Sequence, residues 1–156
     1  MPEGKIKILY VDDEIHNLTT FKATFRTDYE IHICESADLA MKVLEERDID
    51  LIITDQRMPK ITGIEFLESI IDKYPDPARI ILTGYSDLGL VINAINRGRI
   101  HYYMTKPWVM GELKNCIEIV YESYSLKQEN KKMIEKLKLI NTQIEFLLSN
   151  YKETEF

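Results

Sequence analysis

Carboxylates, a hydroxyl and an ammonium group follow apolar runs of this sequence at the points where the runs stop. Asp12 and Asp13 follow the first run, Asp55 the third, Thr83 the fourth and Lys106 the fifth. Three carboxylates brought close together repel one another, and a hard divalent cation is the usual remedy. Mg²⁺ suits a site with few carboxylates, because it keeps bound water and leaves positions open for a phosphate. Lys106 and Thr83 can then hold phosphoryl oxygens, while an Asp acts as the nucleophile that forms an aspartyl-phosphate.

Asp55 on its own also has a simpler interpretation, as a residue that caps a turn at the end of a strand. The run before it, residues 51–54, is apolar and predicts a strand buried on both faces. Pro59 cannot continue the hydrogen-bond ladder of such a strand. Ligands of open α/β sheets bind at the carboxyl ends of the strands. The other four polar residues at strand ends therefore favour the chemical interpretation over turn capping.

Apolar runs alternate along the chain with segments of helical periodicity. We expect strands over residues 5–11, 31–34, 51–54, 79–82 and 100–104, and helices over residues 17–26, 37–46, 64–73, 87–96 and from 110 onward. Ser36 is expected to cap the second helix. The inner face of that helix is expected to hold Leu39, Ala40, Val43 and Leu44.

This alternation predicts an α/β fold, a doubly wound parallel sheet covered by helices on both faces. Because crossover connections are right-handed, few topologies remain. We expect the flavodoxin-like strand order 2-1-3-4-5, with the ligand crevice between strands 1 and 3. That order brings the carboxylates together and places Thr83 and Lys106 at the same edge of the sheet.

Composition narrows the class of protein further. The chain has 156 residues, of which 45% are hydrophobic, so it can bury a core, and no apolar run is long enough for a membrane span. Residues 1–5 lack the apolar core of a signal peptide, so a cytoplasmic protein is expected. Cys34 and Cys116 are expected to be reduced, buried thiols. The net charge of −6 argues against a general nucleic-acid binder.

The motifs, taken in order, resemble the receiver domain of two-component response regulators over about residues 5–125. The matching residues are Asp12-Asp13, Asp55 with Met58-Pro59, Thr83-Gly84, and Tyr103 three residues before Lys106-Pro107. Each element is weak alone, but the full set at these spacings is specific to the family. We therefore expect residues 1–125 to form a receiver domain and residues 126–156 a helical extension.

The resemblance implies a role for each matching residue. Asp55 would accept a phosphoryl group from a histidine kinase, with Thr83 and Lys106 in contact with that group. Asp13 and Asp55 would bind Mg²⁺ directly, Asp12 would hold it through water, and the backbone carbonyl of Arg57 would complete the set. Tyr103 would be the aromatic switch that turns inward as Thr83 moves, although without the motif it would be interpreted as a core aromatic. Such a domain assists its own phosphorylation and is not a turnover enzyme.

Three positions depart from the commonest receiver pattern. Thr62 stands where an Asp often precedes the Gly, and Arg57 and Tyr85 are bulky residues two positions after Asp55 and Thr83. These departures bear on the rate of dephosphorylation. The motifs also resemble receivers at the N-terminus of larger regulators, which carry ATPase-type transcription activators or cyclic-di-nucleotide phosphodiesterases. The sequence contains neither output.

The C-terminal stretch carries a heptad repeat of apolar residues, which predicts a coiled coil. The expected seam consists of Leu126, Asn130, Met133, Leu137, Ile140, Ile144, Leu147 and Tyr151. Asn130 at a core position favours parallel, in-register pairing, so we expect a homodimer through this helix and through the face of helix 4, strand 5 and helix 5. Ile134 and Leu148 widen the apolar stripe, so a bundle of more than two helices is an alternative to the dimer. A second alternative is a single helix that folds back on its own receiver.

Three rival functions are weaker. A metal-dependent phosphatase with an Asp nucleophile would need a second Asp two residues later, where this chain has Arg57. An interaction module that is never phosphorylated would not need the intact set of Asp, Thr and Lys residues. A DNA-binding regulator would need a basic helix-turn-helix, which the heptad stretch cannot supply.

Overall fold

A five-stranded parallel sheet lies at the centre of the computed structural model, which describes residues 4–154. Its strands are β1 (Lys7–Val11), β2 (Glu30–Cys34), β3 (Leu51–Asp55), β4 (Ala78–Thr83) and β5 (Tyr102–Thr105). All neighbours pair in parallel in the order β2-β1-β3-β4-β5, which confirms the predicted flavodoxin-like topology. Every residue of β3 and β4 is buried, as the continuous apolar runs predict.

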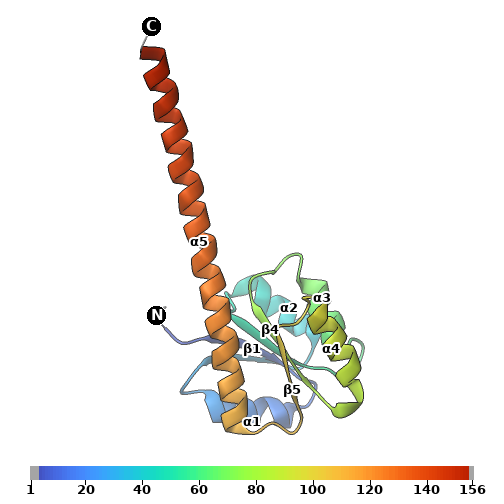
Figure 1. The fold of residues 1–156 in the computed structure, drawn as a ribbon. Helices are drawn as coiled ribbons and strands as arrows, with labels where there is room; N and C mark the ends of the chain where they lie inside the picture. The colour runs from blue at the N-terminus through green and yellow to red at the C-terminus, as the bar shows by residue number, and fades with distance from the viewer. Residues whose placement is uncertain (1–3, 155–156) are drawn as a thin grey trace. The chain divides into compact units, whose positions relative to one another are not determined.

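Helices cover both faces of this sheet (Figure 1). They are α1 (Ile15–Phe25), α2 (Ala37–Glu46), α3 (Gly63–Ile70), α4 (Leu88–Asn96) and α5 (Met110–Thr154), with a short 3-10 turn η1 (Tyr85–Asp87) before α4. Helices α2, α3 and α4 pack on the face that carries Leu9 and Ile52, while α1 packs on the face that carries Tyr10. The two faces thus use alternate residues of the strands.

Several element boundaries differ from the prediction. Helix α3 ends at Ile70 rather than Lys73, and α4 begins at Leu88 rather than Asp87, because Asp87 is the last residue of η1. The predicted inner face of α2 is wrong at Leu39, because this side chain is 46% exposed. Ala40 and Leu44 of the same predicted face are buried. Ser36 caps α2 as predicted, because its hydroxyl accepts the Leu39 N–H at 3.3 Å. Cys34 and Cys116 are free and buried, also as predicted.

The chain divides into two compact units, residues 1–122 and residues 123–156. Helix α5 contributes to both. The assignment of residues 1–125 and 126–156 as functional domains stays a prediction. Residues 1–3, on which the expected lack of a signal peptide partly rests, and residues 155–156 lie outside the described part. Between residues 4 and 154 no helix is both long enough and apolar enough to cross a membrane.

The loop after β3 is held by Gln56, and this fixes the position of Asp55. The backbone N–H of Gln56 donates to the Leu82 carbonyl at 3.0 Å, and its own carbonyl accepts the Gly63 N–H at 2.9 Å. Its buried side chain accepts the Ile64 N–H at 3.0 Å, so it satisfies a free donor at the start of α3. Thr62 completes that start as the N-cap of a capping box with Glu65.

Gly63 is required by the close approach of α3 to the end of β3. A Cβ atom at this position would collide with the backbone carbonyl oxygen of Asp55 and would lie 3.1 Å from Cγ2 of Thr54. Backbone atoms of a central strand cannot give way as the end of a flexible side chain can. The sequence therefore places a glycine where the helix meets the residue that ends β3.

Gly63→Ala is expected to destabilise the protein by about 1–3 kcal/mol, because overpacking at this point forces the backbone of Asp55 to move. Urea unfolding measures the loss. Gly89→Ala in α4 is the matched control, since a Cβ there meets nothing within 4 Å. The control should gain roughly 0.5–1 kcal/mol from helix propensity. Equal stabilities of the two variants would contradict the packing argument.

Candidate functional site

The polar residues predicted to meet at the carboxyl edge of the sheet do meet there. Asp12 follows β1, Asp55 is the last residue of β3, and one carboxylate oxygen from each of Asp12, Asp13 and Asp55 lies within 4.8 Å of the others. Asp12 is fully buried and Asp55 is 7% exposed, while Asp13 is open to solvent. Two carboxylates of the cluster, those of Asp12 and Asp55, are therefore buried, and the third, that of Asp13, faces water.

Lys106 provides the positive charge closest to these carboxylates. Its ammonium nitrogen lies 2.9 Å from Oδ1 of Asp55 and 3.5 Å from Oδ2 of Asp12. The backbone N–H of Lys106 donates to the Thr83 carbonyl at 2.9 Å, which extends the pairing of β4 and β5 by one residue. The sheet itself thus carries Lys106 to the cluster.

Burial and charge act in opposite directions on the groups at the centre. Burial raises the pKa of Asp55; Lys106 lowers it by hydrogen bonding and charge, while Asp12 and Asp13 raise it, and the net result is above the ordinary value. Burial lowers the pKa of Lys106, but its contacts with Asp55 and Asp12 outweigh burial and leave that pKa raised. Lys106 therefore keeps its proton, and burial is the main reason that the pKa of Asp55 stays raised in spite of the ammonium group beside it.

Asp12 is held by donors that the sequence analysis missed. The Tyr10 hydroxyl donates to Oδ2 of Asp12 at 2.8 Å, the Asn17 side-chain amide donates to the same oxygen at 3.1 Å, and the Glu14 N–H donates to Oδ1 at 3.0 Å. A signal for Tyr10 existed, because residues two apart on a strand share a face. Burial and then the charge of Asp12 hold the pKa of Tyr10 far above its ordinary value, so the hydroxyl remains a donor.

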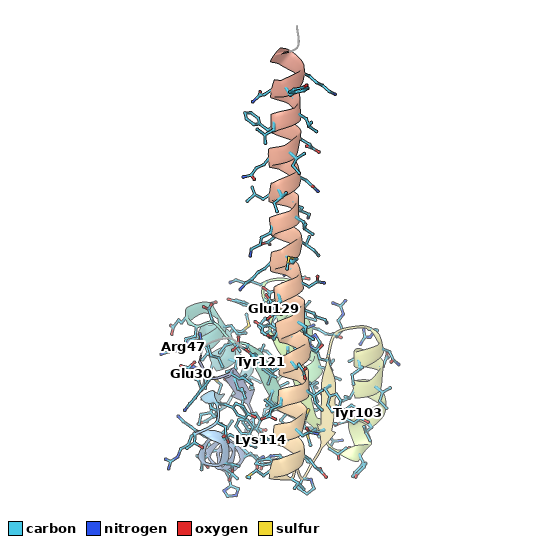
Figure 2. All side chains as sticks on the ribbon, turned by 60° about the vertical axis from the view of Figure 1, so that its left-hand side comes forward. Glu30, Arg47, Tyr103, Lys114, Tyr121 and Glu129 are labelled. Carbon is cyan, nitrogen blue, oxygen red and sulfur yellow. The ribbon has the colours of Figure 1, made fainter. Side chains whose placement is uncertain are left out.

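The two predicted switch residues lie near the site in distinct environments. Thr83 ends β4, is fully buried, and its hydroxyl donates to the Gly84 carbonyl at 3.1 Å. Tyr103 is half-buried on β5, packs against the core beneath α4 and stacks on Tyr102 with ring centroids 6.3 Å apart (Figure 2). Their roles as a switch stay predictions.

Arg57 bridges two loops at the mouth of the site, which the sequence did not indicate. Its guanidinium donates to Oδ2 of Asp87 at 2.8 Å and to the Ser86 hydroxyl at 2.9 Å. The loop after β3 is thereby tied to η1 after β4. The predicted contribution of the Arg57 carbonyl to metal binding stays a prediction.

The donor set of the cluster fits Mg²⁺. All three side chains offer carboxylate oxygens, which this cation prefers, and the exposed Asp13 leaves room for the waters that Mg²⁺ retains. Lys106 occupies one side of Asp55, so a cation would approach from the side of Asp13. The identity of the cation stays a prediction.

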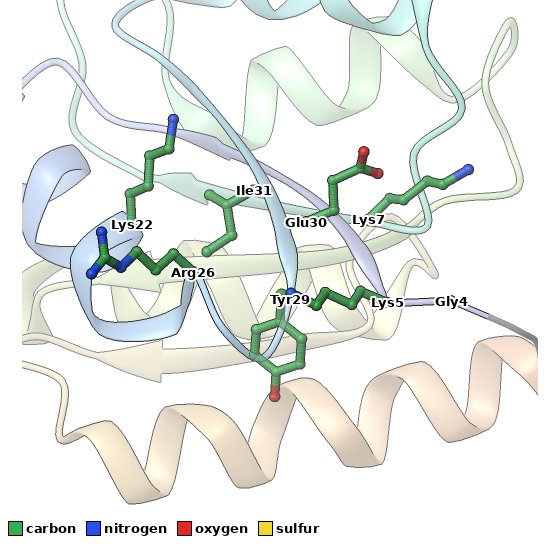
Figure 3. Close-up of a pocket in the computed structure, with 8 residues that line it drawn as sticks. All are labelled: Gly4, Lys5, Lys7, Lys22, Arg26, Tyr29, Glu30 and Ile31. Carbon is green, nitrogen blue, oxygen red and sulfur yellow. The ribbon is translucent and has the colours of Figure 1, made fainter.

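A second hollow, at the edge of the sheet beside β2, does not form a comparable site. Basic residues dominate its lining, which consists of Gly4, Lys5, Lys7, Lys22, Arg26, Tyr29, Glu30 and Ile31. Figure 3 shows that these side chains diverge, with Lys22 and Lys7 on different sides of Ile31 and Tyr29 turned toward α5. They do not converge on a point where an anion could be held.

The sequence matches the family described as response regulator receiver domain over residues 8–118. The chain belongs to this family. It is 35% identical over 122 residues to the hydrogenase transcriptional regulatory protein HoxA of Bradyrhizobium diazoefficiens, covering 78% of this chain and 25% of that protein. It is 34% identical over 131 residues to the DNA-binding transcriptional regulator NtrC of Proteus hauseri, covering 83% of this chain and 27% of that protein. This receiver chain thus spans about a quarter of the length of these curated relatives.

Solved structures share the receiver fold. A chain described as adenylate cyclase from Rhodopirellula baltica superposes with a TM-score of 0.82 at 29% identity, covering 85% of this receiver and 99% of that chain. The signal receiver domain of an HD domain-containing protein from Pseudomonas fluorescens Pf-5 gives a TM-score of 0.75 at 32% identity, covering 83% and 96%.

The C-terminal stretch of α5 exposes its apolar side chains. Seven residues of the predicted seam are between 48% and 64% exposed: Leu126, Met133, Leu137, Ile140, Ile144, Leu147 and Tyr151. Asn130 is exposed as well. Leu139 and Phe146, which lie outside that seam, are 61% and 65% exposed, and the sequence analysis missed them. The described stretch thus presents apolar surface beyond a single two-helix seam.

Lys106→Met is expected to raise the pKa of Asp55 further, because it removes the cation that lowers this pKa and leaves Asp12 and Asp13 in place. Asp55 would then stay protonated to a higher pH, and its carboxylate would form only above that pH. A carbon NMR titration of the Asp55 carboxyl in metal-free protein measures the change. Lys114→Met, which removes a lysine paired with Asp28 at 3.7 Å, is the control (Figure 2). An unchanged or lowered pKa in Lys106→Met would contradict this electrostatic account.

Proposed function

We propose that this receiver takes a phosphoryl group on Asp55 from a histidine kinase, as the phosphoacceptor of a two-component signal transduction system. The observation that carries the proposal is the position of Asp55, at the carboxyl end of the central strand with Lys106 at 2.9 Å and two further carboxylates beside it. Family membership supports the same assignment. A cytoplasmic location is part of the proposal.

The proposed reaction is an in-line displacement at phosphorus. An oxygen of the Asp55 carboxylate attacks the phosphorus and forms the new O–P bond, while the bond from phosphorus to the donor breaks. The leaving group is a histidine imidazole, which takes up a proton, or acetate when acetyl phosphate is the donor. Lys106 offsets charge on a phosphoryl oxygen, and Thr83 is placed to donate its hydroxyl to another. The domain assists this step on itself and is not proposed to turn over substrate.

Mg²⁺ is the proposed cofactor, and when bound it would neutralise charge on the carboxylates and on the phosphoryl oxygens. Asp13 and Asp55 would bind it directly, together with the carbonyl of Arg57. Asp12 would act through water, which agrees with the donors that already occupy its carboxylate.

The proposed output is a change in the contacts between two copies of the chain. Movement of Thr83 toward the phosphoryl group would free space for Tyr103 and repack the face made by α4, β5 and α5. Exposed apolar side chains on these elements, including Leu90, Tyr102 and Ile119, support a contact surface there. The C-terminal seam would hold the homodimer, and no direct contact with nucleic acid is proposed.

An alternative is that the receiver controls a further domain of a larger regulator. The specific observation in its favour is that the chain spans about a quarter of HoxA and NtrC. ATPase-type activation or phosphodiesterase activity would then be the output of that domain. A metal-dependent phosphatase remains disfavoured, because Arg57 stands where its second acid would be and is tied to Asp87.

Asp55→Asn is expected to abolish labelling by radioactive acetyl phosphate or by a cognate kinase, since an amide is not a nucleophile for phosphorus.

Asp13→Ala is expected to remove both Mg²⁺ binding and labelling, because it removes a carboxylate ligand of the proposed metal site. Circular dichroism checks that both variants fold. Full, acid-stable label in Asp55→Asn would move the site to a Ser or Thr, and normal labelling of Asp13→Ala without metal would exclude the proposed charge neutralisation.

The phosphorylated state is expected to be long-lived, because water must reach the phosphorus past Arg57 and Tyr85. Arg57 is fixed at the mouth by Asp87 and Ser86, and it cannot act as a base near neutral pH. Arg57→Ala combined with Tyr85→Ala should speed decay about tenfold, equivalent to ~1.4 kcal/mol of barrier. Phosphorus NMR follows the decay. A decay rate equal to that of the wild type would show that shielding is not the cause.

Leu137→Asp combined with Ile144→Asp is expected to convert a homodimer to a monomer, with phosphorylation of Asp55 nearly normal. Truncation of either residue to Ala should cost roughly 2–5 kcal/mol if a partner helix buries it. Light scattering during size exclusion gives the mass. Thr142→Asp combined with Ser149→Asp, on the side of the heptad away from the seam, is the control and should remain dimeric. A monomeric wild type at tens of micromolar, or a dimeric seam variant, would refute the coiled coil.

A further inference from the structure

A buried tyrosine lies directly behind the carboxylate cluster. Tyr10 is fully buried on β1, two residues before Asp12, so the two side chains leave the strand on the same side. The Tyr10 hydroxyl donates to Oδ2 of Asp12 at 2.8 Å, the shortest contact that Asp12 makes with any described residue.

The donors around Asp12 are distributed unequally between its two oxygens. Among the described residues, Oδ2 accepts from Tyr10, from the Asn17 amide at 3.1 Å and from Lys106 at 3.5 Å, whereas Oδ1 accepts only from the Glu14 N–H, at 3.0 Å. Each carboxylate oxygen has about two lone pairs. Oδ2 is therefore fully used by the protein, and Oδ1 retains acceptor capacity for a cation or its water.

We infer that Tyr10 is a positioning residue of the metal site, whose hydroxyl holds Oδ2 of Asp12 so that Oδ1 faces the bound cation. This inference rests on the proposed magnesium site. It adds a residue outside the carboxylate, Thr and Lys set, and it assigns different tasks to the two oxygens of Asp12.

The ring of Tyr10 is itself fixed, which gives its hydroxyl a defined direction. Phe21 of α1 packs on it with centroids 4.6 Å apart, and the Phe21 ring packs in turn on Phe25 at 5.0 Å and on Trp108 at 6.2 Å. A hydrogen bond from such a ring orients its acceptor better than one from a mobile side chain. Groups behind a metal ligand act in this way on affinity.

Loss of the hydroxyl also affects Lys106. With Tyr10 absent as a donor, Oδ2 keeps Asn17 and Lys106 as its two donors, and Lys106, now 3.5 Å away, can approach it more closely. Lys106 would be drawn from Asp55 toward Asp12, and Asp12 would turn with it. We expect the metal to bind more weakly, with the chemistry intact once metal is saturating.

The chain offers a matched control in Tyr29. This second tyrosine is also buried, at 4% exposure, and packs in the same aromatic cluster, with its centroid 5.8 Å from that of Phe25. Its hydroxyl has no hydrogen-bond partner among the described residues. Tyr10→Phe and Tyr29→Phe thus remove the same atom from similar surroundings, but only the first removal reaches Asp12.

The test is a Mg²⁺ titration of the full chain followed by amide NMR shifts, paired with phosphorylation rates by acetyl phosphate at low and saturating Mg²⁺. Tyr10→Phe should raise the Kd for Mg²⁺ about tenfold and slow phosphorylation at low Mg²⁺, with a rate near the wild type at saturation. Tyr29→Phe should match the wild type throughout. An unchanged Kd in Tyr10→Phe overturns the inference alone. A wild type that shows no Mg²⁺-dependent shifts overturns the magnesium site and this inference with it.

A second measurement needs no variant and so does not depend on Tyr10→Phe folding. The Tyr10 hydroxyl proton is buried and hydrogen-bonded in the wild type, so it should exchange slowly enough to be seen by proton NMR. The chemical shift of this proton should change when Mg²⁺ binds, because a cation near Oδ1 of Asp12 withdraws electron density from Oδ2, which accepts the hydrogen bond of Tyr10. A resonance that stays in place while the amides of the site respond to Mg²⁺ overturns the inference.

Discussion

The repulsion among the carboxylates of Asp12, Asp13 and Asp55 is the constraint on which the rest of the site depends. Their oxygens lie within 4.8 Å, two of the three side chains are buried, and Lys106 supplies a single ammonium group at 2.9 Å from Asp55. Burial is the main cause that keeps the pKa of Asp55 above its ordinary value, and the charges of Asp12 and Asp13 add to it. One cation among three carboxylates also leaves net negative charge at the site. A site in this condition favours a divalent cation and, with it, an anionic phosphoryl group.

The fold maintains this unfavourable arrangement by using parts of the chain that cannot easily relax. Asp55 belongs to a strand buried at every position, and α3 approaches it so closely that only a glycine fits at residue 63. Lys106 is carried to the cluster by the pairing of β4 with β5. Outside the sheet, Arg57 ties the loop after β3 to η1 through an ion pair with Asp87. A strand end that is fixed by the sheet, beside loops that are joined by side-chain contacts, suits a site that changes state when it is modified.

The parallel sheet and the meeting of the main polar residues could be predicted from the sequence, because both follow from periodicity, whereas the strand order also drew on the flavodoxin-like pattern that receivers share. Alternating apolar runs and helices led to the parallel sheet, and polar residues at the ends of those runs led to Asp12, Asp55 and Lys106. The contacts of Arg57 with Asp87 could not be predicted, since 30 residues separate them and their meeting depends on loop conformation. Leu39 was misplaced because the helical period leaves the edge of an inner face undefined. Tyr10 was missed although its spacing from Asp12 placed it on the same face, because the apolar run that contains it was interpreted only as a strand.

The most direct measurement of the central claim is the location of the phosphoryl group on the wild-type chain. The protein is treated with acetyl phosphate and Mg²⁺, the product is reduced with borohydride, and its peptides are sequenced by mass spectrometry. Reduction converts an aspartyl-phosphate to homoserine, so the account predicts homoserine at position 55 and unchanged Asp at positions 12 and 13, with no conversion when Mg²⁺ is chelated. Homoserine at position 12 or 13, conversion that is independent of metal, or no conversion of Asp55 with Mg²⁺ present would contradict it.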